Sequence, residues 1–92
     1  MQATSDKVET GKQWVTHTME SMAKSFNIGL TELQWQSARD GNGIVHTCSV
    51  QGRTKKAAKL FSEEELVSCP LDTHLQQVLV ARLANLMRYL AS

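Results

Sequence analysis

The apolar residues in the first third of the chain recur with the period of a helix. Over residues 10–27 they are spaced by four, three and four places, and they are Val15, Met19, Met22 and Phe26. Thr10 followed by Gln13 is typical of a capping box, and Asp6 offers an alternative start one turn earlier. The pattern predicts a helix over residues 10–27, with Gly29 as its stop signal.

The next part of the chain alternates between apolar and polar residues, which is the period of a half-buried strand. Leu33 and Trp35 follow this period, and residues 44–51 repeat it with a face made of Ile44, His46, Cys48 and Val50. Between them, the tetrapeptide DGNG at 40–43 contains both Asp-Gly and Asn-Gly, pairs typical of tight hairpin turns. The sequence therefore predicts an antiparallel hairpin, and Gly52 predicts the turn that follows it.

Residues 53–61 fit neither period cleanly, because KKAAKL combines good helix formers with scattered charges. The interpretation depends on Ser62 and Glu65, whose spacing is that of a capping box and predicts a helix start at Ser62. Residues 53–61 then form a third strand, with Leu60 in the core. The alternative is one helix from Lys55 to Ser68, which would scatter the apolar side chains around its axis.

A long helix is predicted from Asp72 or Thr73 to the carboxyl end of the sequence. At about 100° per residue, its apolar side chains cover more than half of the circumference, which one face of a small sheet cannot hide. We therefore expect a partner surface on this helix, most simply a second copy of it across a twofold axis. The expected interface residues are Val80, Leu83, Met87 and Leu90. The alternative is a helix deeply wrapped by its own domain.

Together these elements predict an α+β domain with the order helix, three-stranded antiparallel meander, short helix and long helix. Both long helices should pack on one face of the sheet. Residues 1–9 are expected to form a flexible segment ahead of a single domain over residues 10–92, since Val8 is their one plausible core residue. The expected core consists of Val15, Met19, Met22, Phe26, Leu33, Trp35, Cys48, Val50, Leu60, Leu75, Leu79, Leu86 and Leu90.

Composition limits the class of protein without naming a function. The 92 residues are 41% hydrophobic and 21% charged, which is typical of a folded domain, and the formal net charge of +1 provides no global field for a polyanion. Residues 1–13 lack the apolar core of a secretory signal, and the longest apolar run, VLVA at 78–81, is too short to span a bilayer. We expect a cytoplasmic protein with two reduced, packed cysteines.

No combination of residues in the sequence predicts catalysis, because it contains no phosphate-binding glycine loop, nucleophile elbow or HExxH motif. The nearest approach to a metal site is a set of four zinc-type ligands: His46, Cys48, Cys69 and His74. Their spacing matches no common zinc motif, and packed cysteines are the favoured interpretation. The carboxylates of residues 63–65 suit the first turn of a helix. We expect a protein that is not an enzyme and has no metal or other cofactor.

Residues 53–59 are the one local concentration of positive charge. In a strand, Arg53, Lys55 and Lys59 share one face and Lys56 lies on the other. If the first of these faces is the open side of the sheet, it can hold phosphate, with Arg39 adding from the neighbouring strand. Lysines also protect sheet edges against unwanted pairing, which is the favoured interpretation.

The order of helix, three strands and helix, together with KKAAK at 55–59, resembles double-stranded-RNA-binding domains over about a third of the chain. In that family the paired lysines begin the final helix after three strands, whereas here only two predicted strands precede them. None of the family's contact residues is therefore carried over.

The leading hypothesis is a non-catalytic protein-interaction or regulatory module, as a homodimer formed through the C-terminal helix or bound to another protein. The alternative is a small nucleic-acid-binding protein that uses Arg39, Arg53, Lys55, Lys56 and Lys59. No membrane partner is expected.

Overall fold

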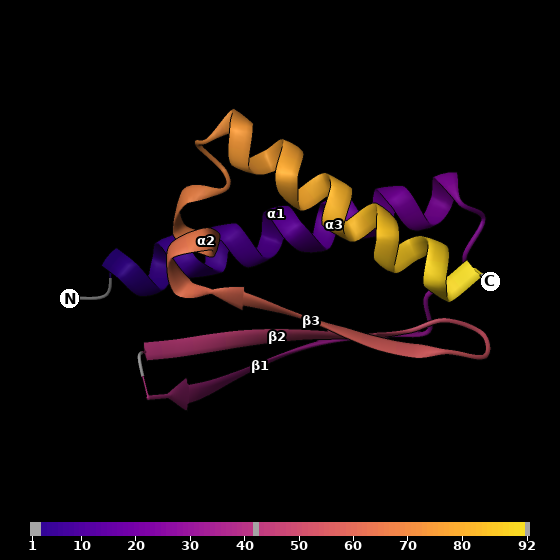
Figure 1. Ribbon diagram of the computed structural model, residues 1–92, viewed down its shortest axis with the longest axis horizontal. Helices are drawn as coiled ribbons and strands as arrows, with labels where there is room; N and C mark the ends of the chain where they lie inside the picture. Colours follow the sequence, from indigo (N-terminus) through magenta and orange to yellow (C-terminus); the bar gives the residue numbers. More distant parts are fainter. Residues whose placement is uncertain (1–2, 42, 92) are drawn as a thin grey trace.

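Two long helices and one short helix lie on the same side of a three-stranded antiparallel sheet (Figure 1). The computed structural model describes residues 3–41 and 43–91. The elements in chain order are α1 (Ala3–Ser25), β1 (Glu32–Asp40), β2 (Gly43–Gln51), β3 (Lys56–Ser62), α2 (Glu63–Ser68) and α3 (Thr73–Ala91). The predicted fold class and element order are confirmed, including the third strand.

Helix α1 begins at Ala3, so the predicted start at Thr10 is wrong. The apolar stripe extends two turns back from Val15 to Val8, which is only 4% exposed, and this burial favours a longer helix. The hydroxyl of Thr10 donates a hydrogen bond to the carbonyl of Asp6 within the helix (3.0 Å) instead of capping its start. Residues 1 and 2 of the predicted flexible segment lie outside the described residues, and the mobility of residues 3–9 stays a prediction.

The other end of α1 is closed by a Schellman motif. Asn27 has a φ of 58°, in the left-handed region that asparagine tolerates better than most residues. Its amide donates to the carbonyl of Lys24 (3.1 Å), and the amide of Ile28 donates to the carbonyl of Ala23 (2.7 Å). The left-handed residue that stops the helix is therefore Asn27, and not Gly29 as the sequence analysis expected.

The register of the sheet is fixed by its two hairpins. The first closes at Asp40 opposite Gly43 and extends to Glu32 opposite Gln51. The second pairs β2 with β3 from Val45 opposite Ser62 to Gln51 opposite Lys56. His46, Cys48 and Val50 are the buried positions of β2, as predicted. Asn42 of the predicted turn lies outside the described residues.

Strand β3 presents the opposite face to the one predicted. Phe61 is 1% exposed and belongs to the core, whereas Leu60 is 62% exposed. Phe61 lies directly opposite His46, and directly opposed residues of an antiparallel pair point to the same side of the sheet. Its ring packs on that of Trp35, with 5.6 Å between the centroids. A shift of one residue exchanges the two faces of a strand, so the expectation that Leu60 lies in the core is wrong.

The predicted helix starts after the sheet are confirmed. The amide of Glu65 donates to the hydroxyl of Ser62 (3.1 Å), and the amide of Ser62 donates to the carboxylate of Glu65 (3.0 Å), which completes the capping box of α2. The amide of Leu75 donates to the carboxylate of Asp72 (3.1 Å) at the start of α3. The second oxygen of Glu65 also meets Arg82 of α3 at 3.3 Å, so the same side chain connects both helices.

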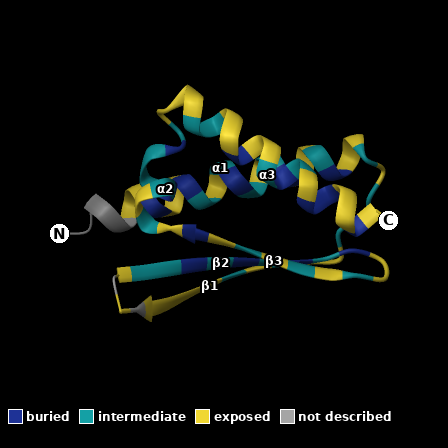
Figure 2. Cartoon of the chain, viewed as in Figure 1, coloured by how far each residue is buried: buried dark blue, intermediate teal, exposed yellow. Residues whose placement is uncertain are grey.

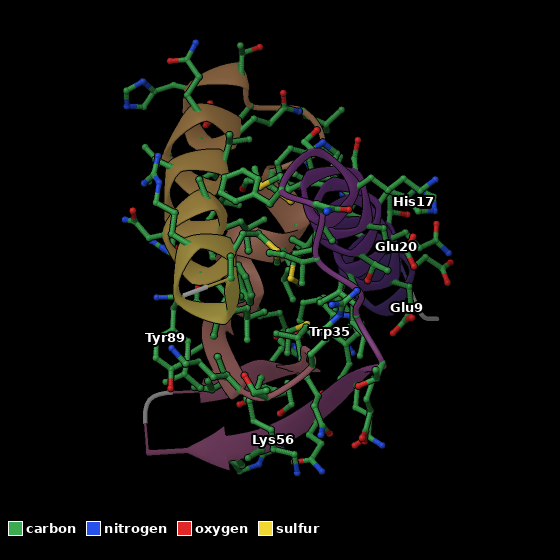
Figure 3. The ribbon with its side chains drawn as sticks, turned by 90° about the vertical axis from the view of Figure 1, so that its right-hand side faces the viewer. Glu9, His17, Glu20, Trp35, Lys56 and Tyr89 are labelled. Atoms are coloured by element: carbon green, nitrogen blue, oxygen red, sulfur yellow. The ribbon has the colours of Figure 1, made fainter. Side chains whose placement is uncertain are left out.

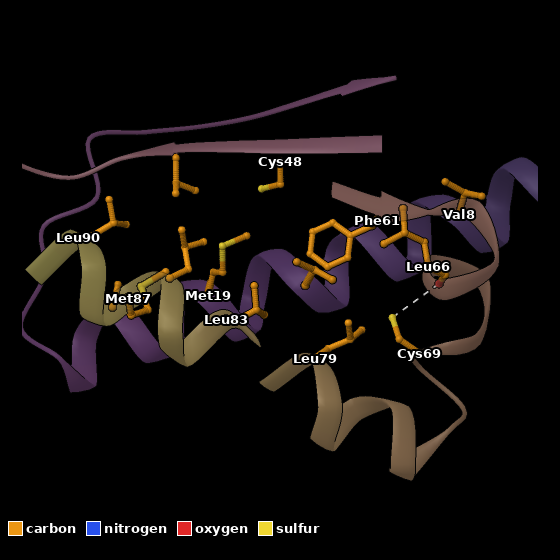
Figure 4. Packing of buried hydrophobic residues seen from close by; sticks show 14 residues of the cluster. Val8, Met19, Cys48, Phe61, Leu66, Cys69, Leu79, Leu83, Met87 and Leu90 are labelled. Carbon is orange, nitrogen blue, oxygen red and sulfur yellow. Dashed lines mark hydrogen bonds between the residues drawn. The ribbon is translucent and has the colours of Figure 1, made fainter. Parts of the chain in front are cut away.

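The core lies between the sheet and the helices (Figures 2 and 4). Cys48 and Phe61 contribute to it from the sheet, Met19 from α1 and Leu83 from α3. Five residues expected in the core are partly buried at its border: Met22, Phe26, Leu33, Trp35 and Leu75. Trp35 also donates from its ring nitrogen to the hydroxyl of Thr16 (3.0 Å), which connects the sheet to α1.

Helices α1 and α2 approach most closely at Gly11. A β-carbon added at this position would overlap the carbonyl oxygen of Leu66, which belongs to the backbone and cannot rotate away. Leu66 itself is completely buried. The contact explains a glycine in the middle of a long helix, where it is otherwise unfavourable by about 1 kcal/mol relative to alanine.

We expect Gly11→Ala to lower the free energy of unfolding by about 1–3 kcal/mol, the usual cost of overpacking, although alanine is the better helix former. Gly29→Ala is the matched control, because a β-carbon there has no neighbour within 4 Å. Urea unfolding followed by circular dichroism measures both. Equal stability of the two variants would contradict the close approach of α1 and α2.

Candidate functional site

The side of the sheet that faces away from the helices is not covered by any element of the described chain (Figures 1 and 3). We call it the open face. Figure 3 shows Lys56 on this side and Trp35 between the sheet and α1. The strand register arranges the open face in four rows across β1, β2 and β3: Glu32–Gln51–Lys56, Gln34–Ser49–Ala58, Gln36–Thr47–Leu60 and Ala38–Val45–Ser62.

The middle of the open face is uncharged. Leu60 is its largest apolar side chain, and Thr47 and Val45 of the neighbouring strand are half-buried beside it. The two charged residues of the four rows, Glu32 and Lys56, stand at opposite ends of one row. They also border a shallow groove of about 410 Å³ that extends along this end of the face. These four rows therefore combine an uncharged centre with one charged end, and Asp40 and Gly43 continue β1 and β2 beyond the other end.

A hairpin turn and the pairing of β3 with β2 determine which residues face outward. The DGNG turn sets Asp40 opposite Gly43, which fixes which residues of β1 and β2 share a face of the sheet. The capping box at Ser62 ends β3 one residue after Phe61, and Phe61 is large enough to occupy the inner position opposite His46. Leu60 is left on the outer side as a consequence.

The basic segment at residues 53–59 does not form the phosphate-binding face that the alternative interpretation requires. Lys59 lies opposite Cys48 and so shares the helix side of the sheet. The nitrogen of Lys55 lies 4.9 Å from the ring centroid of Tyr89 in α3, and Arg53 precedes β3 in the turn. Lys56 is the one cation of the segment on the open face. The condition for phosphate binding, that Arg53, Lys55 and Lys59 share the open side, is therefore not met, because burial of Phe61 turns the alternate positions of β3 toward the helices.

Arg39 does not add to this charge. It lies opposite Ile44, whereas Lys56 lies opposite Gln51, at the other end of β2. Seven residues of strand separate the two positions, about 23 Å at 3.3 Å per residue. Arg39 also lies on the same face of β1 as Trp35, whose side chain points toward α1. The five expected nucleic-acid contacts therefore do not gather in one place.

The wide apolar face of α3 is largely enclosed within the chain. Leu83 and Met87 are 0% exposed and Leu90 is 5% exposed, so these three residues do not supply the expected partner surface. α3 packs against α1 as well as against β3, and together they bury a wider arc than the sheet alone could cover. Val80, 38% exposed, is the one expected interface residue that reaches the surface. The wrapped helix, the alternative interpretation, describes the structure.

A serine–histidine contact lies near the turn of the first hairpin. The hydroxyl of Ser37 and Nδ1 of His46 are 2.7 Å apart, and His46 is 5% exposed. Its Nε2 atom is buried without a hydrogen-bond partner in the described chain. Sequence reasoning missed this pair, although the DGNG turn contains the signal: closing the hairpin at Asp40 and Gly43 sets Ser37 opposite His46.

This contact does not have the geometry of a nucleophile and its base. In such a pair one ring nitrogen contacts the serine, and a carboxylate or carbonyl commonly orients the other. Here the second nitrogen of His46 has no such group and points into the protein. Burial lowers the pKa of His46, and Lys12 lowers it further, while Glu63 and Glu9 oppose the shift. The imidazole is therefore held neutral.

The two cysteines are free and buried. Burial raises the pKa of Cys48 to about 12 and that of Cys69 to about 11, so both remain thiols at neutral pH. The sulfur of Cys69 points to the carbonyls of Leu66 (3.7 Å) and Gly11 (3.9 Å), and His74 is exposed at the start of α3. Within residues 3–41 and 43–91, no three histidine, cysteine or carboxylate residues gather in a way that could hold a metal ion.

Comparison of the chain with protein-family models gives no match, and comparisons with curated proteins and solved structures give no significant match. Among the described residues, no helix has both the length and the apolar character needed to cross a membrane. Function must therefore be inferred from the surfaces of the chain.

The buried imidazole predicts a stability that falls with acid. An unfolded histidine takes up a proton near pH 6.5, whereas folded His46 resists protonation until a lower pH. The free energy of unfolding should therefore decrease as the pH falls below about 6.5, by at most about 1.4 kcal/mol per pH unit. Urea unfolding at a series of pH values measures this slope. The His46→Gln variant should show a smaller slope from pH 6.5 down to the pH at which carboxylates begin to take up protons. The control variant His17→Gln removes an exposed histidine and should show the native slope.

The cysteines should not react in the folded protein. Because both are buried and protonated, we expect a disulfide reagent such as DTNB to modify neither at pH 8, and to modify both after unfolding in urea. The absorbance of the released thiolate measures the reaction. Rapid modification of either native thiol would contradict this placement of Cys48 and Cys69.

Proposed function

We propose that this protein is a non-catalytic interaction module that self-associates through the open face of its sheet. The observation that carries the proposal is the 62% exposure of Leu60 on the edge strand β3, on a sheet face that no element of the described chain covers. Val45, Ala38 and Ala58 extend the apolar surface around it.

The free energy of burial supports this role. Covering an exposed leucine side chain contributes roughly 1.5–3 kcal/mol, and smaller apolar neighbours add to it. Antiparallel sheets often leave one face in water, and such faces carry polar side chains, as six of the twelve residues in the four rows do here. Here charge is confined to Glu32 and Lys56 at one end of the four rows. The small net charge of +1 also means weak repulsion between copies of the chain.

The open face replaces the C-terminal helix as the proposed surface, because Leu83, Met87 and Leu90 lie in the core. Nucleic-acid binding has less support, since the register separates Arg39 from Lys56 and sends Lys59 to the helix side. We keep the cytoplasm as the proposed location, because both cysteines are free and buried.

The proposal predicts a mass in solution that rises with protein concentration. Sedimentation equilibrium should fit a monomer–dimer equilibrium for the native chain, and Leu60→Gln should shift it toward monomer by tenfold or more, about the effect of 1.4 kcal/mol. Two matched controls remove other exposed apolar side chains: Leu71→Gln before α3 and Val80→Gln on α3. Neither control should change the equilibrium.

A single monomer mass at all concentrations would overturn the proposal. Loss of the dimer in Val80→Gln but not in Leu60→Gln would indicate that the interface lies on α3 and not on the open face. Circular dichroism of each variant shows whether the fold is intact before the masses are compared.

A further inference from the structure

We infer that two copies of the chain pack open face against open face about a twofold axis parallel to the strands, so that Glu32 of each copy meets Lys56 of the other. This inference rests on the proposed function, because it specifies the partner and the orientation of the same surface. Its basis is the placement of two opposite charges at the two ends of one row of the open face.

Neither charge has an ion-pair partner within the described chain. The salt bridges of the described residues join Lys12 to Glu9 and Arg82 to Glu65. Glu32 and Lys56 both lie opposite Gln51, on either side of β2, so their backbones are about 10 Å apart at 4.8 Å per strand. Each charge is therefore available to another molecule.

The symmetry of a twofold interface converts this arrangement into two ion pairs. An axis along β2, in the plane between the two sheets, keeps each row at the same height and exchanges the outer strands. It therefore places β1 of one copy over β3 of the other. Glu32 then faces Lys56 of the second copy, and the same contact occurs a second time by symmetry.

The remaining rows fit the same orientation. Large side chains of β1 meet small or apolar ones of β3, since Gln34 lies over Ala58 and the aliphatic part of Gln36 lies over Leu60. On the axis itself, Thr47 and Val45 meet their own copies. No like charges are brought together among these rows, and the strands of the two sheets remain aligned, as in the usual packing of antiparallel sheets.

The other in-plane axis is less favourable. A twofold axis across the strands reverses the order of the rows, so that Glu32 would lie over Ala38 and Lys56 over Ser62. Both charges would lose contact with water at the rim without gaining a partner, which costs free energy. Charge complementarity therefore selects the axis parallel to the strands.

The size of the face predicts a weak dimer. Three strands and four rows cover only about 400 Å² on each copy, at 4.8 Å between strands and about 6.6 Å between rows. This is about half of the area that each partner contributes to a standard stable interface. We therefore expect dissociation in the micromolar range or above, with the two ion pairs acting mainly on orientation.

Charge reversal tests the orientation directly. Glu32→Lys gives two lysine–lysine contacts in its homodimer, and Lys56→Glu gives two glutamate–glutamate contacts. Each variant should dimerise at least about tenfold more weakly than the native chain at low salt. An equimolar mixture of the two variants pairs lysine with glutamate at both contacts. The mixture should therefore recover native dimerisation as a heterodimer, which native mass spectrometry and sedimentation detect.

Glu20→Lys and Lys24→Glu are the matched control variants, because both residues are exposed on α1, which lies on the helix side of the sheet and not on the open face. They make the same changes in net charge, and neither they nor their mixture should alter dimerisation. High salt should reduce the difference between single and mixed open-face variants, since exposed ion pairs are screened.

The outcomes separate this inference from the proposed function. Recovery on mixing Glu32→Lys with Lys56→Glu supports both. A native dimer that Leu60→Gln disrupts, with no recovery on mixing, overturns the orientation and leaves the proposed function standing. A native chain that is monomeric at every concentration overturns both.

Discussion

Phe61 occupies the inner position opposite His46, and the arrangement of the rest of the surface depends on this contact. Its ring fills the space between β2, Trp35 and the helices, where it is 1% exposed. Because the side chains of a strand alternate, burial of Phe61 sends Lys59 to the helix side and exposes Leu60 and Lys56 on the other. One aromatic side chain thus determines which residues of β3 remain accessible to a partner.

Packing between the helices and the sheet also buries most of the apolar residues of the C-terminal helix α3. α2 follows β3 directly and approaches α1 so closely at Gly11 that no larger side chain fits there. This short helix extends the core beyond the sheet. Leu66 within the helix and Cys69 directly after it are completely buried. α3 packs against α1 as well as against β3, so it finds apolar contacts over a wider arc than a sheet alone provides. Its breadth of apolar residues reflects burial within one chain.

Within the described residues, the open face has few charged residues and no deep cavity, and the titratable groups that could take part in catalysis are buried elsewhere. His46 is neutral and enclosed, the thiols are protonated, and the cations are divided between both sides and both ends of the sheet. By contrast, Leu60 is exposed on the open face, two rows from the row that carries Glu32 and Lys56. In the proposed dimer, a second copy of the same surface would cover Leu60 and pair both charges.

The sequence by itself determined the order of the elements, since the DGNG turn, the Ser62 capping box and the Asp72 cap are local signals that act through neighbouring residues. It did not determine the faces. Leu60 and Phe61 are both apolar and adjacent, so only the pairing of Phe61 with His46 could decide which is buried. The start of α1 depended in the same way on contacts of Val8 with the core, and the burial of α3 depended on its packing against α1 and β3. These outcomes rest on contacts between residues far apart in the chain, which a local pattern does not contain.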